Sequence, residues 1–167
     1  MKNLLFVLFL YVCSCTPIAT YPPIETDAAR NFTEHVNEPV PTILVLTLEY
    51  AHQHFGGMEQ IVFNLPEGIR NATYAKVAER IPNAVPMSKI GQPAYHIIEL
   101  RVRGFEADAD LLFPSTGGGY EMATIHLEAA VLEKWHVSRD RVWLVPISEV
   151  PQPNDTSIAS GSTTNTQ

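Results

Sequence analysis

The stretch AYHIIELRVRGFEADADLLF, residues 94–113, decides the fold, because apolar and charged side chains alternate on both sides of its single glycine. Alternation with a period of two is typical of a strand that buries one face and exposes the other. A two-residue turn at Arg103-Gly104 would pair the two halves as neighbouring antiparallel strands. The sequence therefore predicts a β-hairpin with one apolar face and one charged face.

The predicted turn also determines which residues lie opposite one another in the hairpin. On the apolar face the expected pairs are Val102 with Phe105, Leu100 with Ala107, and Ile98 with Ala109. On the charged face the expected pairs are Arg101 with Glu106 and Glu99 with Asp108. The first face belongs to the core, and the second face is acidic.

Four carboxylates crowd the charged face of the hairpin: Glu99, Glu106, Asp108 and Asp110. Two carboxylates directly opposite each other destabilise a sheet unless a cation relieves them. We expect an exposed salt-bridge network to do so, with Arg101, Arg139 and Arg141 as the candidate cations. A bound cation such as calcium is the alternative, although carboxylates on a flat sheet converge poorly on one ion.

The remaining elements are predicted from periodicity and from turn residues. Continuous β-rich runs predict strands at 42–50 (TILVLTLEY) and 59–65 (EQIVFNL). Apolar residues at helical spacing predict one short helix, which begins at Asn71, runs through Arg80 and is ended by Pro82. After a glycine-rich loop, two more alternating strands are expected in YEMATIHLEAAV and WHVSRDRVWLV.

Together these elements predict an α+β fold. We expect a mostly antiparallel, curved sheet of about five to six strands, with one short helix packed on one face. Domains with a cystatin-like or nuclear-transport-factor-like shape resemble this arrangement, and the likeness is in topology alone. The folded domain is expected to span residues 42–148.

The composition favours one folded body. The chain has 167 residues, of which 46% are hydrophobic and 17% charged, which is too apolar for a disordered chain. With 11 Lys and Arg against 18 Asp and Glu, the net charge is −7. A negative surface repels nucleic acid, so no nucleic-acid partner is expected. The sequence carries no motif of a common enzyme class, and we predict neither a catalytic residue nor a cofactor.

The chain opens with a segment typical of a secretory signal peptide. Lys2 supplies a positive charge, and the nine residues Leu4–Val12 form an apolar run. As a helix this run is about 14 Å long, roughly half of the ~30 Å hydrocarbon core of a bilayer. Because the run is too short to span a membrane, it predicts export.

The stretch Val12-Cys13-Ser14-Cys15 resembles the lipobox of bacterial lipoproteins, with an aliphatic residue and a small residue ahead of the cysteine that is lipidated. The resemblance implies that residues 1–14 are removed as the signal peptide. It also implies that Cys15 is the lipid-attachment residue, whose acyl chains anchor the mature protein in a membrane. Thr16 in place of aspartate implies outer-membrane sorting in a host with two membranes. The expected location is therefore the cell envelope, on the outer membrane or the periplasmic face.

Plain secretion without a lipid is the alternative. Three Asn-x-Thr sequons, at Asn31, Asn71 and Asn154, leave a eukaryotic secreted glycoprotein open. On either side of the domain, residues 15–41 are rich in proline and predict a lipid anchor followed by an extended tether. Residues 149–167 have almost nothing to bury and predict a disordered tail.

Two histidines, His52 and His54, would lie on one face of an extended segment. With Glu49 or Glu59 they would make a set of two histidines and one carboxylate, which can hold a transition metal. A solvent-facing pair on a loop between strands is the alternative, and we predict no metal site.

His126 is expected on the same strand face as Thr124 and Glu128. There it could join Asp108 or Asp110 as an acid–base pair. A chance neighbourhood in an acidic protein is the alternative, and the site is not predicted to be catalytic.

Two functions follow from these observations. The first is a non-catalytic, membrane-anchored binding domain that docks a protein of the cell envelope. The second is a small-ligand pocket, enzymatic or not, enclosed between the sheet and the helix with His126 inside. Trp135 and Trp143, expected on one strand face, would belong to the core or form an exposed binding platform.

Overall fold

The computed structural model describes residues 18–23, 35–56, 58–147 and 152–155. Seven strands and two helices lie in these residues. In chain order they are β1 (Ile18–Tyr21), α2 (Val40–His54), β2 (Val62–Asn64), α3 (Asn71–Arg80), β3 (Val85–Pro86), β4 (Tyr95–Arg103), β5 (Glu106–Pro114), β6 (Tyr120–Ala130) and β7 (Glu133–Ile147). The predicted helix at 71–80 is α3, which confirms that prediction.

All seven strands belong to one sheet in the order β3-β2-β4-β5-β6-β7, and β1 pairs with β4 on the edge that β2 also uses. Strands β4 to β7 form an antiparallel meander, whereas β2 runs parallel to both β3 and β4. The α+β prediction is confirmed. The sheet is mixed, however, and a second helix is present, so the expectation of a single helix was wrong.

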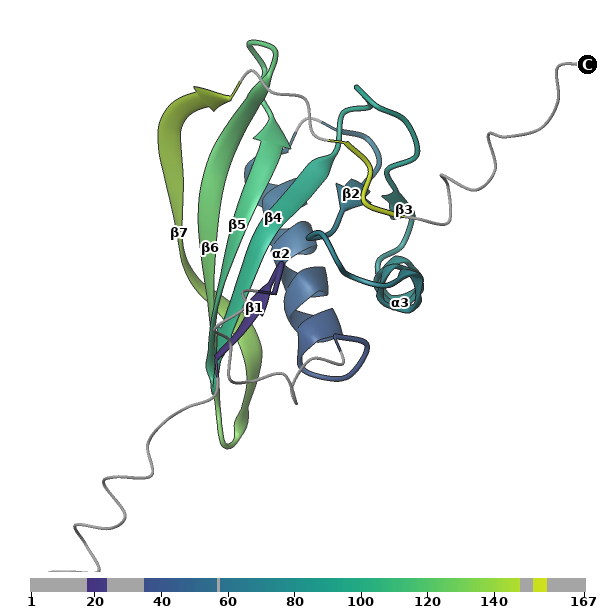
Figure 1. The fold of residues 1–167 in the computed structure, drawn as a ribbon. Helices are drawn as coiled ribbons and strands as arrows, with labels where there is room; N and C mark the ends of the chain where they lie inside the picture. Colours follow the sequence, from purple (N-terminus) through teal and green to yellow (C-terminus); the bar gives the residue numbers. More distant parts are fainter. Residues whose placement is uncertain (1–17, 24–34, 57, 148–151, 156–167) are drawn as a thin grey trace, which may run out of the picture.

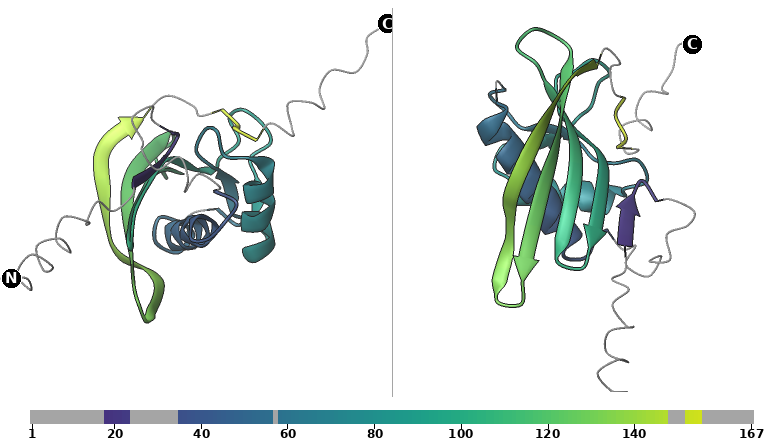
Figure 2. Two further views of the ribbon diagram at one scale, coloured as in Figure 1. Left: turned by 60° about the horizontal axis from the view of Figure 1, so that its bottom comes forward. Right: turned by 90° about the vertical axis from the view of Figure 1, so that its left-hand side faces the viewer.

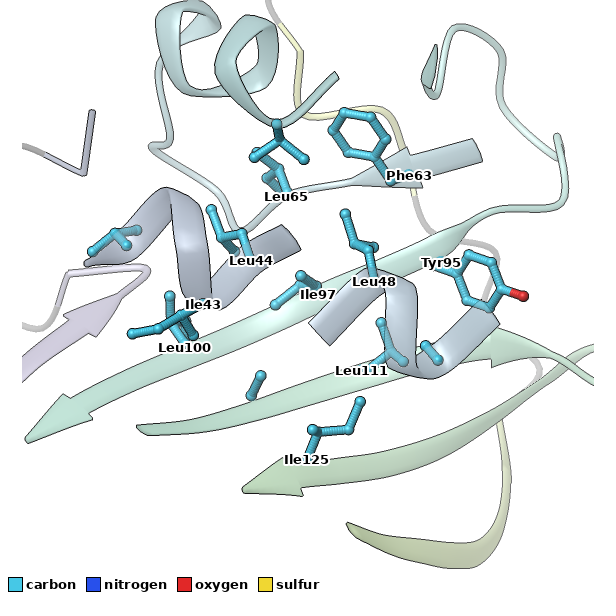
Figure 3. Packing of buried hydrophobic residues seen from close by; sticks show 14 of the residues in the cluster. Ile43, Leu44, Leu48, Phe63, Leu65, Tyr95, Ile97, Leu100, Leu111 and Ile125 are labelled. Carbon is cyan, nitrogen blue, oxygen red and sulfur yellow. The ribbon is translucent and has the colours of Figure 1, made fainter. Parts of the chain in front are cut away.

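The sheet curves around one side of α2, and α3 lies beside α2 on the side away from the long strands (Figures 1 and 2). We call the sheet face that contacts α2 the inner face, and the opposite one the outer face. The core fills the space between α2 and the inner face (Figure 3). Its side chains with no exposed surface include Ile43, Leu44, Leu48, Leu100, Leu111 and Ile125. Burial of each such side chain contributes about 1.5–3 kcal/mol to stability.

Helix α2 overturns the predicted strand at 42–50. A continuous apolar run fits a buried helix as well as a buried strand, and here it forms a helix that extends from Val40 to His54. Pro41 is favourable in the first turn, because the backbone N–H groups there have no acceptor within the helix, so proline, which lacks an N–H, loses no hydrogen bond. In addition, the backbone N–H and the hydroxyl of Thr42 both donate to the Glu38 carboxylate, which satisfies one free donor of that turn.

The β4–β5 hairpin exists as predicted, but its turn lies one residue further along, at Gly104-Phe105. Gly104 has a φ of 60°, which suits the first central position of a type II′ turn and is unfavourable for other residues. From Glu99 to Val102, each cross-strand pair therefore differs from the prediction by two residues on β5. Arg101 lies opposite Asp108, and Glu99 lies opposite Asp110.

A register shift between Ile97 and Glu99 changes which isoleucine is buried. Ile98 was expected on the apolar face, yet it is 39% exposed, whereas Ile97 is buried in the core. Such a bulge inserts an extra residue into one strand and thereby reverses the alternation from that point. Alternation in the sequence alone does not reveal it.

Both segments that flank the predicted domain contain residues that pack on it. Within the predicted tether, Ile18–Tyr21 forms β1. Within the predicted tail, the Gln152 carbonyl accepts from the Asn64 side chain, and the Asn154 side chain donates to the Leu65 carbonyl. The signal peptide, the lipid-attachment residue Cys15 and the sequon at Asn31 lie outside the described residues. None of the helices in the described part of the chain has the length and apolar character needed to cross a membrane.

Candidate binding site on the outer face of the sheet

The side chains of β6 alternate regularly between the inner and the outer face of the sheet. Ala123, Ile125 and Leu127 point toward the core and have no exposed surface, as the sequence predicted. Because side chains alternate along a strand, Thr124 and His126 lie on the outer face. The expected space between helix and sheet is filled by apolar side chains, so His126 does not lie in an enclosed pocket there.

A bulge in β7 decides which of its side chains join His126. Leu127 lies opposite Val137, but His126 lies opposite Arg139, so β7 carries one extra residue at this point. Trp135 and Val137 therefore pack against the core, whereas Arg139, Arg141 and Trp143 lie on the outer face. The expectation that the two tryptophans share a face was wrong for this reason.

A continuous network of polar contacts crosses the outer face from β4 to β7. Arg101 Nη1 donates to Glu99 Oε1 at 3.0 Å and to Asp110 Oδ2 at 2.7 Å. The expected network is therefore present for Arg101, which relieves two carboxylates of the hairpin. Of the other two candidate cations, neither has an ion pair among the described residues. The hydrogen bond to Asp110, followed by that to Glu99, raises the pKa of Arg101 above its ordinary value, although partial burial opposes this.

The network continues from Asp110 toward β7. Thr124 Oγ1 donates to Asp110 Oδ1 at 2.6 Å, and Trp143 Nε1 donates to Thr124 Oγ1 at 3.0 Å. The hydroxyl of Thr124 is therefore both a donor and an acceptor, and it holds the indole of Trp143 in one orientation. The guanidinium carbon of Arg141 lies 3.9 Å from the centroid of the Trp143 ring, which is cation–π geometry.

His126 lies between two carboxylates. Its Nδ1 is 2.5 Å from Asp108 Oδ1, and its Nε2 is 3.2 Å from Glu128 Oε1. Ser138 Oγ donates to the same Glu128 oxygen at 3.1 Å. Ionised carboxylates only accept hydrogen bonds, so both contacts are hydrogen bonds at once only when both ring nitrogens carry a proton. The structure thus brings His126 to Asp108, one of its two expected partners, and not to Asp110.

These residues surround a groove of about 470 Å³. Its lining includes Asp108, Thr124 and His126 from β5 and β6, and Arg139, Arg141 and Trp143 from β7. The groove combines an indole ring, two guanidinium groups and a fixed hydroxyl, all on strands β6 and β7. We call it the outer-face groove.

Within the described part of the chain, the two arginines of the outer-face groove differ from its acids in having no ionic partner. Among the residues that the structure describes, no carboxylate lies within ion-pair distance of Arg139 or Arg141. By contrast, Asp108 is engaged by His126, and Asp140 accepts a 2.7 Å hydrogen bond from the hydroxyl of Tyr50. The groove therefore presents cationic donors to a ligand while its carboxylates are already occupied.

The His52 and His54 pair does not form the predicted arrangement, because α2 is a helix. Residues two apart on a helix project about 200° from each other, so the two imidazoles do not share a face. His54 stacks on Tyr50 with the ring centroids 3.9 Å apart, and His52 Nδ1 lies 3.4 Å from the Tyr95 hydroxyl. Within the described residues, no group of three or more His, Cys, Asp or Glu side chains is arranged to hold a metal ion.

Sequence reasoning missed the most deeply buried histidine of the described residues, His96 on β4. It is 1% exposed, its Nε2 lies 3.3 Å from the Tyr120 hydroxyl, and its Nδ1 has no hydrogen-bond partner among the described residues. Burial lowers the pKa of His96 to about 4, because a charged imidazolium would lose its hydration there. Strict alternation with Ile98 and Leu100 would put His96 on the apolar face of the hairpin. The bulge between Ile97 and Glu99 turns it to the outer face instead, and nothing in the sequence signalled that this end of the outer face is covered.

No family model, curated protein or solved structure matches this chain.

Proposed function

We propose that the chain is an exported, lipid-anchored binding domain, and that it takes a small anionic ligand in the outer-face groove. The observation that carries the proposal is the pair of arginines without ionic partners, Arg139 and Arg141, beside the indole of Trp143. A guanidinium group offers a planar fork of donors that matches a carboxylate or a phosphate. An aromatic or sugar ring attached to that anion would find apolar contact at the edge of the indole.

The contacts of His126 favour binding over catalysis. A general base needs a ring nitrogen with a free lone pair within reach of the substrate. Both nitrogens of His126 already face carboxylate oxygens, from Asp108 and Glu128, so neither ring nitrogen is left without a partner to act on a substrate. Thr124 is likewise committed, because it donates to Asp110 and accepts from Trp143.

Anion binding is tested by a tryptophan-fluorescence titration of the full chain with phenyl phosphate. Phenol serves as the control ligand, because it keeps the ring and lacks the anion. Replacing both Arg139→Gln and Arg141→Gln should weaken binding at least about tenfold, or ~1.4 kcal/mol. The control Arg103→Gln removes an exposed arginine that does not line the groove and should leave binding unchanged. Equal binding of phenol and phenyl phosphate would contradict the proposal.

The anchor is tested separately through Cys15. The proposal expects the intact mass of the membrane-extracted protein to show loss of residues 1–14 and acyl chains on Cys15. The change Cys15→Ser should move the protein out of the membrane fraction, whereas Cys13→Ser should leave it there. Retention of the Cys15→Ser chain in the membrane fraction would contradict the anchor and leave the groove untouched.

A further inference from the structure

Two hairpin tips at one end of the sheet carry exposed apolar side chains. Phe105 in the β4–β5 turn is 57% exposed, and Val131 and Leu132 in the β6–β7 turn are 85% and 98% exposed. The backbone N–H of Ala129 donates to the Phe105 carbonyl at 2.8 Å, which holds the two tips side by side. Both lie at the lower end of the sheet in Figure 1, and the β6–β7 tip projects beyond the other.

The same end of the sheet receives the N-terminal strand. Ile18, the first residue of β1, lies opposite Arg103, immediately before the β4–β5 turn. Cys15 precedes Ile18 by three residues. A fully extended chain spans about 3.6 Å per residue, so Cys15 can lie no more than about 11 Å from the start of β1. A lipid on Cys15 would thus hold this end of the domain against the membrane.

The charges around the tips permit such an approach. Four charged residues border the two turns: Arg103, Glu106, Glu133 and Lys134. Two are positive and two negative, so this end is locally neutral, although the chain as a whole carries −7. An anionic bilayer therefore repels this end less than it repels the rest of the surface.

We propose that the two tips insert Phe105, Val131 and Leu132 into the interfacial zone of the bilayer that holds the lipid. This inference rests on the proposed lipidation of Cys15. It gives the domain a defined orientation instead of a place at the end of a long tether. In this orientation the outer-face groove stays clear of the bilayer, since Arg139 lies roughly 20–25 Å along β7 from the inserted tip.

The orientation is tested with a fluorescent label on the full, lipidated chain in vesicles of phosphatidylethanolamine and phosphatidylglycerol. The mature chain has no cysteine besides Cys15, so Leu132→Cys introduces one free thiol for an environment-sensitive dye. The matched control is Leu144→Cys, because Leu144 is 94% exposed and lies near the opposite end of β7. Nitroxide groups on the lipid acyl chains should quench the dye at position 132 strongly and leave the dye at position 144 unquenched.

The outcomes separate this inference from the anchor itself. If intact mass shows lipid on Cys15 and only the dye at position 132 is quenched, both the anchor and the insertion of the tips are supported. Lipid on Cys15 with equal quenching at the two positions overturns the insertion of the tips while the anchor stands. Absence of lipid on Cys15 overturns the anchor and with it the orientation. Adding Phe105→Asp to the Leu132→Cys chain should reduce the quenching, because a carboxylate in the interfacial zone opposes insertion.

Discussion

The two faces of the same sheet differ in what their side chains do. On β6, Ile125 faces α2 and is fully buried among apolar side chains, whereas its neighbours Thr124 and His126 each hold contacts to carboxylates on the outer face. Inner residues are exchangeable in principle for others of the same volume. The outer residues form a network in which each member fixes the next, from Arg101 to Trp143. The comparison teaches that the apolar core belongs to the inner face, whereas the outer face carries the polar groups that we propose for ligand recognition.

The largest expected effect is on the inner face. Leu48→Ala should lower the free energy of unfolding by about 2–5 kcal/mol, because it removes buried methyl groups and leaves a cavity. The control Leu144→Ala truncates an exposed leucine and should change it by less than about 0.5 kcal/mol. Urea unfolding followed by circular dichroism measures both. Similar losses in the two variants would contradict the assignment of the core.

A pH dependence of comparable size is expected from His96, which lies at the covered end of the outer face. Its pKa is about 4 in the folded chain against 6.5 for an ordinary histidine, so the unfolded state takes up a proton first as the pH falls. The stability it contributes is complete above about pH 6.5 and declines down to about pH 4, by roughly 3 kcal/mol in total.

The measurement for His96 is the free energy of unfolding at several pH values, compared between the native chain and His96→Gln. The contributions of titratable groups that both chains share cancel when the two free energies of unfolding are subtracted. The native chain should lose stability more steeply than the variant between these two pH values. Parallel curves would show that His96 is not buried in its neutral form.

A smaller effect is expected from the network on the outer face. Arg101→Ala leaves Asp110, whose side chain is 11% exposed, without its ionic partner. The cost should be about 1–3 kcal/mol, since the carboxylate stays largely buried and keeps only the bond from Thr124. The control Arg103→Ala lies on the same strand, is exposed and has no ion pair among the described residues, and it should be near neutral. A loss in the control as large as in Arg101→Ala would contradict the network.

The smallest stability effect belongs to the residues that we expect to matter most for binding. Replacing Arg139 and Arg141 together by glutamine should change the free energy of unfolding by less than about 1 kcal/mol, since only the cation–π contact of Arg141 is lost. The same change should abolish most of the binding of phenyl phosphate. If the double variant bound phenyl phosphate normally, or if it were unfolded, the proposed difference in role between the two faces would be contradicted.

Much of the fold could be predicted from alternation, and the failures have physical causes. The meander, the helix at 71–80 and the inner positions of β6 follow from periodicity. The apolar run at 42–50 did not distinguish helix from strand, because a continuous apolar sequence is compatible with either element when that element is buried on all sides. The turn of the β4–β5 hairpin was misplaced by one residue, because two-residue turns accept glycine at more than one position.

The site was predictable in part. Asp108 and Asp110 were both candidate partners of His126, and the structure brings His126 to Asp108. Trp135 and Trp143 were expected to share a face, and they do not, because a bulge in β7 shifts the alternation between Val137 and Arg139. The covered environment of His96 depends on residues distant in sequence, such as Tyr120, and only the tertiary structure brings them together.

The most direct test uses the only two tryptophans of the chain, one on each face. In a two-dimensional amide NMR spectrum of the full chain, each indole N–H gives its own signal. Titration with phenyl phosphate should shift the signal of Trp143, whose N–H is bonded to Thr124 in the outer-face groove, and leave that of Trp135 in place. A shift of Trp135 alone, or no shift of either signal at saturating ligand, would contradict the proposal that the outer face binds an anion.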